Sequence, residues 1–247
     1  MMSQMRRPGL QVGLAALAVF VVVAVTAEVS SDPKRAPRIS TLVFSDDFSG
    51  TTLSSHWTRY DSEGNGGHGL RRPDAISLDG KGNLVITASM RGGRLVSGGM
   101  NARLIQTYGR YEVRVRTEPD PTGTMSGVVL TWPANGNWPV AGENNIYETG
   151  ASAGSRHTFH SYVHYGKSNR QHSFTHDADA DQWHTITMDW RPNAIRFWRD
   201  GALVWTVTDR RAIPDNPHFL AIQLDATSER RLTRPVRMFV DYIRIWR

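Results

Sequence analysis

The 247-residue chain contains no cysteine, so it can form no disulfide and offers neither a zinc–thiolate site nor a thiol nucleophile. After the first thirty residues it also lacks long helix-forming tracts of Leu, Ala, Glu and Lys, and it contains no internal repeat or low-complexity segment. Glycine (22 residues), proline (12) and tryptophan (8) are frequent instead. This composition favours many short strands joined by turns, in a chain long enough to bury a core without cross-links.

The first residues follow the order of a secretory signal peptide. Arg6 and Arg7 form a basic start, an uncharged and mostly apolar stretch follows at 9–24, and small residues precede Glu28. We therefore expect residues 1–27 to be a signal peptide and the protein to be secreted. An uncleaved membrane anchor is the alternative, because the apolar stretch is nearly long enough to span a bilayer. In both cases the domain lies outside the cytoplasm.

The rest of the chain is expected to form one monomeric domain. Residues 28–40 are polar and contain two prolines, which is typical of a linker, and no second boundary is visible within 41–247. The formal net charge is +6, but the arginines are scattered and accompany no helix-turn-helix or RNA-binding signature. The charge therefore predicts a basic surface rather than nucleic-acid binding, and such a surface could hold the protein near an anionic cell wall.

Alternating and apolar segments predict an all-β fold. Tyr111, Val113 and Val115 alternate with charged residues, as in a strand with one wet face, whereas 127–132 is mostly apolar, as in a strand buried on both faces. Further strands are expected at 84–88, 159–165, 184–190, 194–199, 203–207 and 238–246, with Asp200-Gly201 as a hairpin turn. Many short strands at this spacing predict a jelly-roll β-sandwich of two antiparallel sheets.

The segment 138–148 contains two glutamates that could carry chemistry. On a regular strand Glu143 and Asn145 share a face, and Glu148 has the wrong parity for it. One extra residue in a β-bulge, at Ile146 or Tyr147, would aim all three side chains into one cleft. Two carboxyl groups about 5–5.5 Å apart are what a retaining glycosidase requires. The alternative is two unrelated surface glutamates on an edge strand.

This segment resembles the signature of glycoside hydrolase family 16, which includes laminarinases, lichenases, agarases and carrageenases. The family pattern is Glu-x-Asp-x-x-Glu, usually preceded by Trp-Pro-x-x-Gly, and Trp138, Pro139 and Gly142 stand at the matching positions. Further blocks resemble the family in order, at 44–53, 108–114, 183–201 and 240–244. The resemblance implies a concave sheet that carries the cleft, with Glu143 as the nucleophile and Glu148 as the general acid/base.

The central Asp of the family pattern is Asn145 in this chain. Asn keeps the shape but carries no charge, so we expect a lower pKa for Glu148 and a weaker proton donor. The resemblance implies endo-acting hydrolysis of a β-linked polysaccharide with retention, most commonly a β-1,3-glucan or mixed-linkage glucan. A sugar-binding protein without turnover and a transglycosylase are the alternatives.

Other residues are expected to contact the polysaccharide. Trp138 precedes Glu143 by five residues, where the family places a cleft Trp, and its ring could stack on sugar. Trp132 fits a cleft or the core. By resemblance, Asn101 and Arg103 reach the substrate and His164 faces the cleft near the acid/base, although Arg103 could equally be structural.

No cofactor is expected to be required for the reaction. Asp241 resembles a position that helps to hold a structural calcium ion in several relatives of the family. One Asp on a terminal strand does not by itself define a calcium site. Trp57, Trp190, Trp198, Trp205 and Trp246 lie among apolar neighbours and are expected in the core.

Overall fold

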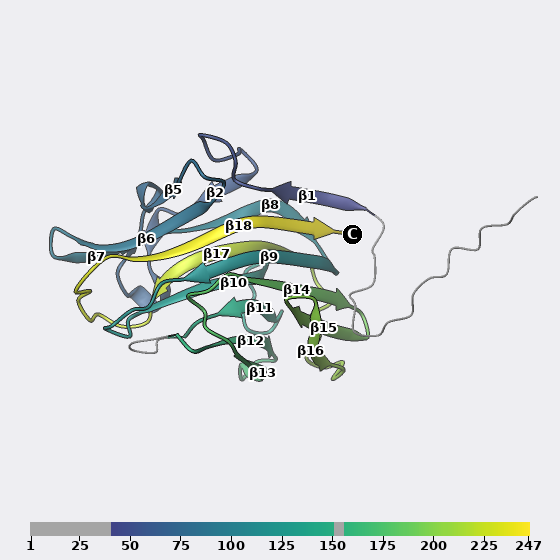
Figure 1. Cartoon of the computed structure of the whole chain (residues 1–247). Coiled ribbons are helices and arrows are strands. Elements are labelled where there is room, and N and C mark those ends of the chain that lie inside the picture. Colours follow the sequence, from purple (N-terminus) through teal and green to yellow (C-terminus); the bar gives the residue numbers. More distant parts are fainter. Residues whose placement is uncertain (1–40, 151–155) are drawn as a thin grey trace, which may run out of the picture. The chain divides into compact units, whose positions relative to one another are not determined.

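The computed structural model describes residues 41–150 and 156–247, and the predicted signal peptide and linker lie outside these residues. Within them the chain forms eighteen β-strands and two short 3-10 helices, arranged in two sheets (Figure 1). Every strand pairing is antiparallel except that of β4 with β7. The predicted all-β sandwich is confirmed. None of the helices in the described ranges is long and apolar enough to cross a membrane.

Sheet A has eleven strands in the order β16-β15-β14-β9-β18-β6-β7-β4-β3, with β1 paired to β18 and β5 paired to β6. Its strands are β1 (Leu42–Asp46), β3 (Ser62–Glu63), β4 (Leu70–Arg71), β5 (Ile76–Leu78), β6 (Leu84–Arg91), β7 (Arg94–Ser97), β9 (Gly109–Thr117), β14 (His184–Arg191), β15 (Ala194–Arg199), β16 (Ala202–Val207) and β18 (Val236–Trp246).

Sheet B has seven strands in the order β13-β12-β11-β10-β17-β8-β2. Its strands are β2 (Trp57–Arg59), β8 (Gly99–Gln106), β10 (Met125–Pro133), β11 (Glu143–Glu148), β12 (Thr158–Tyr165), β13 (Arg170–Asp177) and β17 (His218–Ala226). The two 3-10 helices, η1 (Asn65–Gly67) and η2 (Pro73–Ala75), lie in the connections between the early strands.

The main core consists of alternate residues of both sheets. Val113 and Val115 of β9 enter it together with Val129 of β10 and Phe159 of β12, all at most 1% exposed. Residues between them on each strand point to the opposite face, since side chains alternate along a strand. Sheet B therefore has an outer face directed away from this core.

Strand β10 is buried on both faces, as its apolar sequence predicts. Val129 packs in the main core, whereas Val128 and Leu130 form a small second cluster with Ala221 of β17. Trp132 and Phe219 pack against this second cluster. The outer face of sheet B thus has an apolar floor at its centre, and the predicted motif of Glu143, Asn145 and Glu148 lies on the next strand, β11.

The strands expected from alternation are all present, and the turn at Asp200-Gly201 joins β15 to β16. Both turn residues have positive φ, 51° and 83°, as in a two-residue hairpin whose twist matches its strands. One core assignment is wrong. Trp246 is half-buried on the outer face of sheet A, where the Arg110 guanidinium lies 5.0 Å from its ring centre.

Candidate active site

Strand β11 brings the three residues of the predicted motif to one face. Its register against β10 and β12 shifts after Asn145, so Ile146 is an extra residue in a β-bulge. Ile146 and Tyr147 consequently both enter the main core, 1% and 0% exposed. Glu148 returns to the face of Glu143 and Asn145, as its hydrogen bond with Asn145 shows. The predicted bulge is present, at the first of the two expected positions.

Gly142 allows the chain to turn into β11 immediately before Glu143. Its φ is +78°, a left-handed conformation that residues with a side chain rarely adopt. A Cβ at this position would lie 2.7 Å from Pro214 Cγ and 3.1 Å from the carbonyl oxygen of His164. Glycine is therefore needed here both for its backbone conformation and for the close packing of the neighbouring chain.

The two glutamates form an electrostatically coupled pair. Burial raises the pKa of Glu143 to about 7, although side-chain hydrogen bonds with Trp138 and Asn145 lower it. Burial also raises the pKa of Glu148, and the charge of Glu143 raises it further, whereas the hydrogen bond with Asn145 lowers it. Because one ionised carboxylate disfavours the second, the pair favours a state that shares a single proton. A carboxylate beside a carboxylic acid is the state that a double displacement requires.

Asn145 donates to both carboxyl groups. Its Nδ2 lies 2.6 Å from Glu148 Oε2, and a side-chain hydrogen bond also connects it to Glu143. Its Oδ1 is buried and accepts no hydrogen bond among the described residues. The amide therefore serves as a neutral donor between two acids, a role that an ionised aspartate cannot fill.

Asn145 is only one of the influences on the pKa of Glu148. The amide lowers the pKa of Glu148 through its hydrogen bond, but burial is the largest influence and the net shift is upward. Glu148 is thus placed to keep its proton to a higher pH than an ordinary glutamate. The effect of the missing aspartate charge on proton donation by Glu148 stays a prediction.

Trp138 and Trp132 form an aromatic wall beside Glu143. Their rings are stacked, with centres 5.8 Å apart and planes 14° from parallel. Trp138 is 40% exposed, while Trp132 is half-buried against the second apolar cluster. Trp138 thus presents a solvent-exposed indole ring next to the carboxyl pair, and such a ring can stack on a sugar.

Strand β12 adds a row of side chains along the same cleft. His164 pairs in register with Glu143, Tyr162 with Asn145 and His160 with Glu148. His164 lowers the pKa of Glu148 electrostatically, in agreement with its predicted place near the acid/base. Tyr162 and His160 were not predicted as cleft residues, although the period of two from His164 along the expected strand would have identified them.

Asn101 and Arg103 lie farther away, on β8, which two strands separate from β11. Asn101 pairs in register with Ala221, a member of the second apolar cluster, and therefore lies along the outer face of sheet B. Arg103 is exposed. Among the described residues no contact connects either side chain to the two glutamates, so their role with substrate stays a prediction.

An ion pair that the sequence did not predict lies on the outer face of sheet B, between Arg71 of β4 and Asp225 of β17. Arg71 donates from Nε and Nη2 to the two oxygens of Asp225, at 2.8 and 2.6 Å, and lies 5.5 Å from the centre of the Tyr60 ring. The charge of Asp225 contributes to the raised pKa of Glu148. The pair therefore lies within electrostatic reach of the candidate acid/base.

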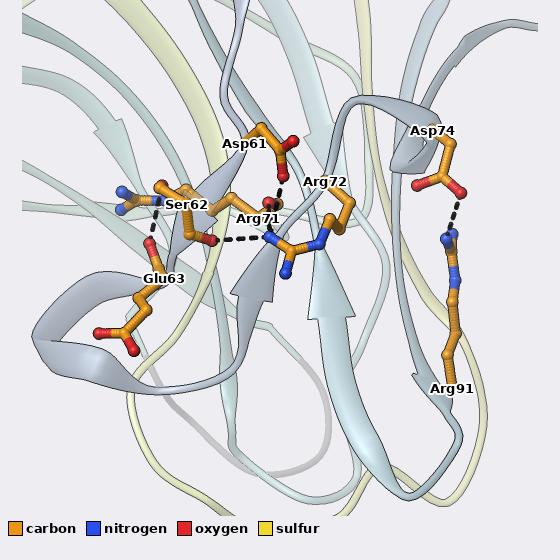
Figure 2. A network of polar contacts seen from close by, with 7 residues as sticks. All are labelled: Asp61, Ser62, Glu63, Arg71, Arg72, Asp74 and Arg91. Atoms are coloured by element: carbon orange, nitrogen blue, oxygen red, sulfur yellow. Dashed lines mark hydrogen bonds and ion pairs between the residues drawn. The ribbon is translucent and has the colours of Figure 1, made fainter.

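The segment that carries Arg71 is fixed by its neighbour Arg72. The Arg72 guanidinium lies 3.0 Å from Asp61 and donates to the carbonyl oxygen of Ser62 at 3.3 Å (Figure 2). A separate pair, Arg91 with Asp74 at 2.8 Å, ties β6 to the connection that follows β4. These surface contacts hold β3 and β4 where Arg71 can reach Asp225.

A buried arginine anchors the end of β11. Arg156, 2% exposed, donates to Thr149 Oγ1 at 2.7 Å and to the carbonyl oxygens of Gly150, Met125 and Glu118 at 3.0, 2.6 and 2.8 Å. Thr149 follows Glu148 directly. The guanidinium therefore fixes the backbone that leads out of the candidate acid/base.

Asp241, the predicted calcium ligand, forms an ion pair with Arg114 across β18 and β9. Within residues 41–150 and 156–247, no group of three or more His, Asp or Glu side chains is placed to hold a metal ion. A carboxylate already neutralised by a guanidinium does not fit a calcium site. Calcium binding at Asp241 thus stays a prediction that no contact here supports.

Solved structures with a similar fold include laminarinases and glucanases. The laminarinase from Rhodothermus marinus has a TM-score of 0.73 at 21% identity, over 83% of this chain and 96% of that one. The catalytic domain of an endo-1,3-beta-glucanase (laminarinase) from Thermotoga petrophila RKU-1 has a TM-score of 0.72 at 19% identity, over 84% and 97%. A Bacteroides ovatus mixed-linkage glucan GH16 protein, in complex with a G4G4G3G product, has a TM-score of 0.70 at 22% identity, over 82% and 99%.

These structural likenesses show the jelly-roll fold. Among curated proteins, no sequence match to this chain is found. At the level of families, residues 69–244 match the sequence profile described as "Glycosyl hydrolases family 16", which is well over half of the chain. The matched range includes the whole carboxyl pair on β11 and the strands on both sides of it. The chain therefore belongs to glycosyl hydrolase family 16.

Proposed function

We propose that this protein is a secreted, retaining endo-glycosidase that cleaves a β-glucan. The observation that carries the proposal is the placement of Glu143 and Glu148 on one face of β11, buried and coupled through Asn145. Two acids that share one proton in a water-poor site are suited to glycosidic bond cleavage. The N-terminal pattern of residues 1–27 supports secretion.

The proposed reaction proceeds in two displacements. The ionised Glu143 attacks the anomeric carbon while the protonated Glu148 donates to the departing glycosidic oxygen. Glu148 then removes a proton from water, which attacks the glycosyl–Glu143 ester and restores the starting state. Asn145 stabilises the negative charge on either carboxylate by donating to both, and so supports the proton transfer in both directions.

The sugar class rests on the aromatic wall and on the relatives. The wall of Trp138 and Trp132 suits the apolar face of a pyranose ring. The similar structures include an endo-1,3-beta-glucanase and a mixed-linkage glucan protein. We therefore assign a β-1,3-glucan or a mixed-linkage β-glucan as the substrate class.

The proposal is tested with Glu143→Gln, assayed on a panel of β-1,3-, mixed-linkage and other polysaccharides by the release of reducing ends. We expect wild-type release from a β-glucan and none from the variant, which should still bind the same sugar because its shape is kept. Glu118→Gln changes a half-buried glutamate just after β9, away from the carboxyl pair, and is the matched control, which should retain activity. Full hydrolysis by Glu143→Gln would remove Glu143 from the mechanism. If the wild type binds a polysaccharide but hydrolyses none, the protein is a sugar-recognition protein and not an enzyme.

Replacing Trp138 tests two separate roles. Trp138→Phe keeps a ring but removes the hydrogen bond that lowers the pKa of Glu143, so this pKa should rise above about 7 and the acidic limb of the pH–rate profile should move to higher pH. Trp138→Ala should also weaken oligosaccharide binding by about 1–3 kcal/mol, a range taken from stacking on nucleobases. The melting temperature should hardly change. A large loss of stability with unchanged binding would place Trp138 in the core instead.

Asn145→Asp tests the shared amide. The new carboxylate removes the donor to both glutamates and adds a negative charge, and both effects raise the two pKa values. Because Glu143 must be ionised and its pKa is already about 7, we expect the whole bell-shaped profile to move to higher pH and the rate below neutrality to fall. Asn193→Asp, the same change in an exposed turn on sheet A, is the control. An unshifted profile, or a faster rate at acidic pH, contradicts the proposed role of Asn145.

A further inference from the structure

A second hollow lies on the outer face of sheet A, away from the two glutamates. It has a volume of about 450 Å³ and is lined by residues of β9, β14, β15 and β18, among them Glu112, Thr185, Thr187 and Tyr242. The residues that alternate with these, such as Val113 and Ile186, fill the core between the sheets. The hollow therefore opens on the side of the sandwich opposite to the carboxyl pair, and its size falls within the range of about 300–1,000 Å³ that is usual for ligand pockets.

Glu112 forms a rigid polar group in this hollow. Its side chain is only 13% exposed, and it accepts hydrogen bonds from Arg110 Nη2 at 2.8 Å, from Thr187 Oγ1 at 3.2 Å and from the Tyr242 hydroxyl at 3.4 Å. The proposed reaction on β11 does not use this carboxylate. Charged and hydroxyl groups held in fixed directions can pair with the neighbouring hydroxyls of a sugar ring.

The hairpin between β15 and β16 supplies a wall of the same hollow. Asp200 accepts from the Thr185 backbone N–H at 2.8 Å, and its second oxygen lies 2.8 Å from His184 Nδ1. Asp200 and Gly201 both line the hollow. The turn is thus locked to β14, and the wall is preformed rather than assembled on binding.

Two aromatic side chains complete the lining. Trp198 is 2% exposed and belongs to the floor, while Tyr242 is half-buried, with the Arg244 guanidinium 4.2 Å from its ring centre. Only Tyr242 of these two offers aromatic surface to a ligand, and such surface beside paired donors and acceptors suits a carbohydrate site. Arg110 in the lining and Arg244, whose guanidinium lies 3.6 Å from Glu112, balance the two acids Glu112 and Asp200, so the hollow carries no net charge that would select an anionic polymer.

We propose that this hollow binds a neutral sugar unit of a polysaccharide, as a second site separate from the cleft. A chain held there cannot reach Glu143 or Glu148, since the sandwich lies between. The site would keep the enzyme on an insoluble or long glycan without taking part in cleavage. The choice of a β-glucan as the bound polysaccharide rests on the proposed function. The existence of the second site does not rest on it.

The experiment uses Thr185→Trp, which fills the hollow, with Thr87→Trp as the matched control on β6 of the same sheet, where Thr87 pairs with exposed Arg237. Both are made in the Glu143→Gln chain for binding and in the active chain for kinetics. Retention on insoluble β-1,3-glucan particles and migration in a native gel containing mixed-linkage glucan are measured, together with kcat/KM on a short soluble β-glucan oligosaccharide. Thr185→Trp should reduce retention by about threefold or more through lost avidity and leave kcat/KM nearly unchanged.

The control Thr87→Trp should be retained as strongly as its parent. If Thr185→Trp does not fold, Tyr242→Phe removes one hydroxyl from the lining and should reduce retention to a smaller degree. The second site is overturned if Thr185→Trp and Tyr242→Phe are retained as strongly as their parent. It is also overturned if Thr87→Trp loses as much retention as Thr185→Trp, or if neither glucan retains the parent. If the wild type hydrolyses no glucan but Thr185→Trp still reduces retention, the proposed function is overturned and the second site is not.

Discussion

One extra residue in β11 is the constraint on which the candidate active site depends. Without the bulge at Ile146, a regular strand would turn either Tyr147 or Glu148 to the wrong face. The main core accepts both Ile146 and Tyr147, and the Tyr147 hydroxyl donates there to Thr117 Oγ1 at 3.0 Å. Core packing therefore holds the bulge in place, and the bulge places the second carboxyl group beside the first.

The chemistry of the pair follows from burial more than from any single neighbour. Burial raises the pKa of both glutamates, and hydrogen bonds with Asn145 act against this shift on each. One neutral amide thus stabilises the ionised form of either acid without adding a third charge. The aromatic wall of Trp138 and Trp132 limits water on one side, and Arg156 fixes the backbone that follows Glu148. The site combines low polarity with rigid support, which is how two identical side chains can take different roles.

Much of this arrangement could be predicted from the sequence, because periodicity and parity are local properties. The alternation in β9 and the apolar run in β10 predicted their burial, and the wrong parity of Glu148 predicted the bulge. Long-range pairings could not be predicted in this way. The Arg71–Asp225 pair joins residues 154 positions apart, and β17, which forms part of the floor of the cleft, was not recognised as a strand. Trp246 shows the same limit, since only the partner strand shows that an arginine, not the core, covers its ring.

In the proposed mechanism, Glu143 and Glu148 act as nucleophile and acid/base from one face of β11. The most direct test of this mechanism is proton NMR of the anomeric configuration of the first product released from a β-glucan. Two successive inversions at the anomeric carbon should give the β anomer first, followed by slow mutarotation to the mixture. Appearance of the α anomer first would contradict the account, because a single displacement by water needs no covalent bond to Glu143.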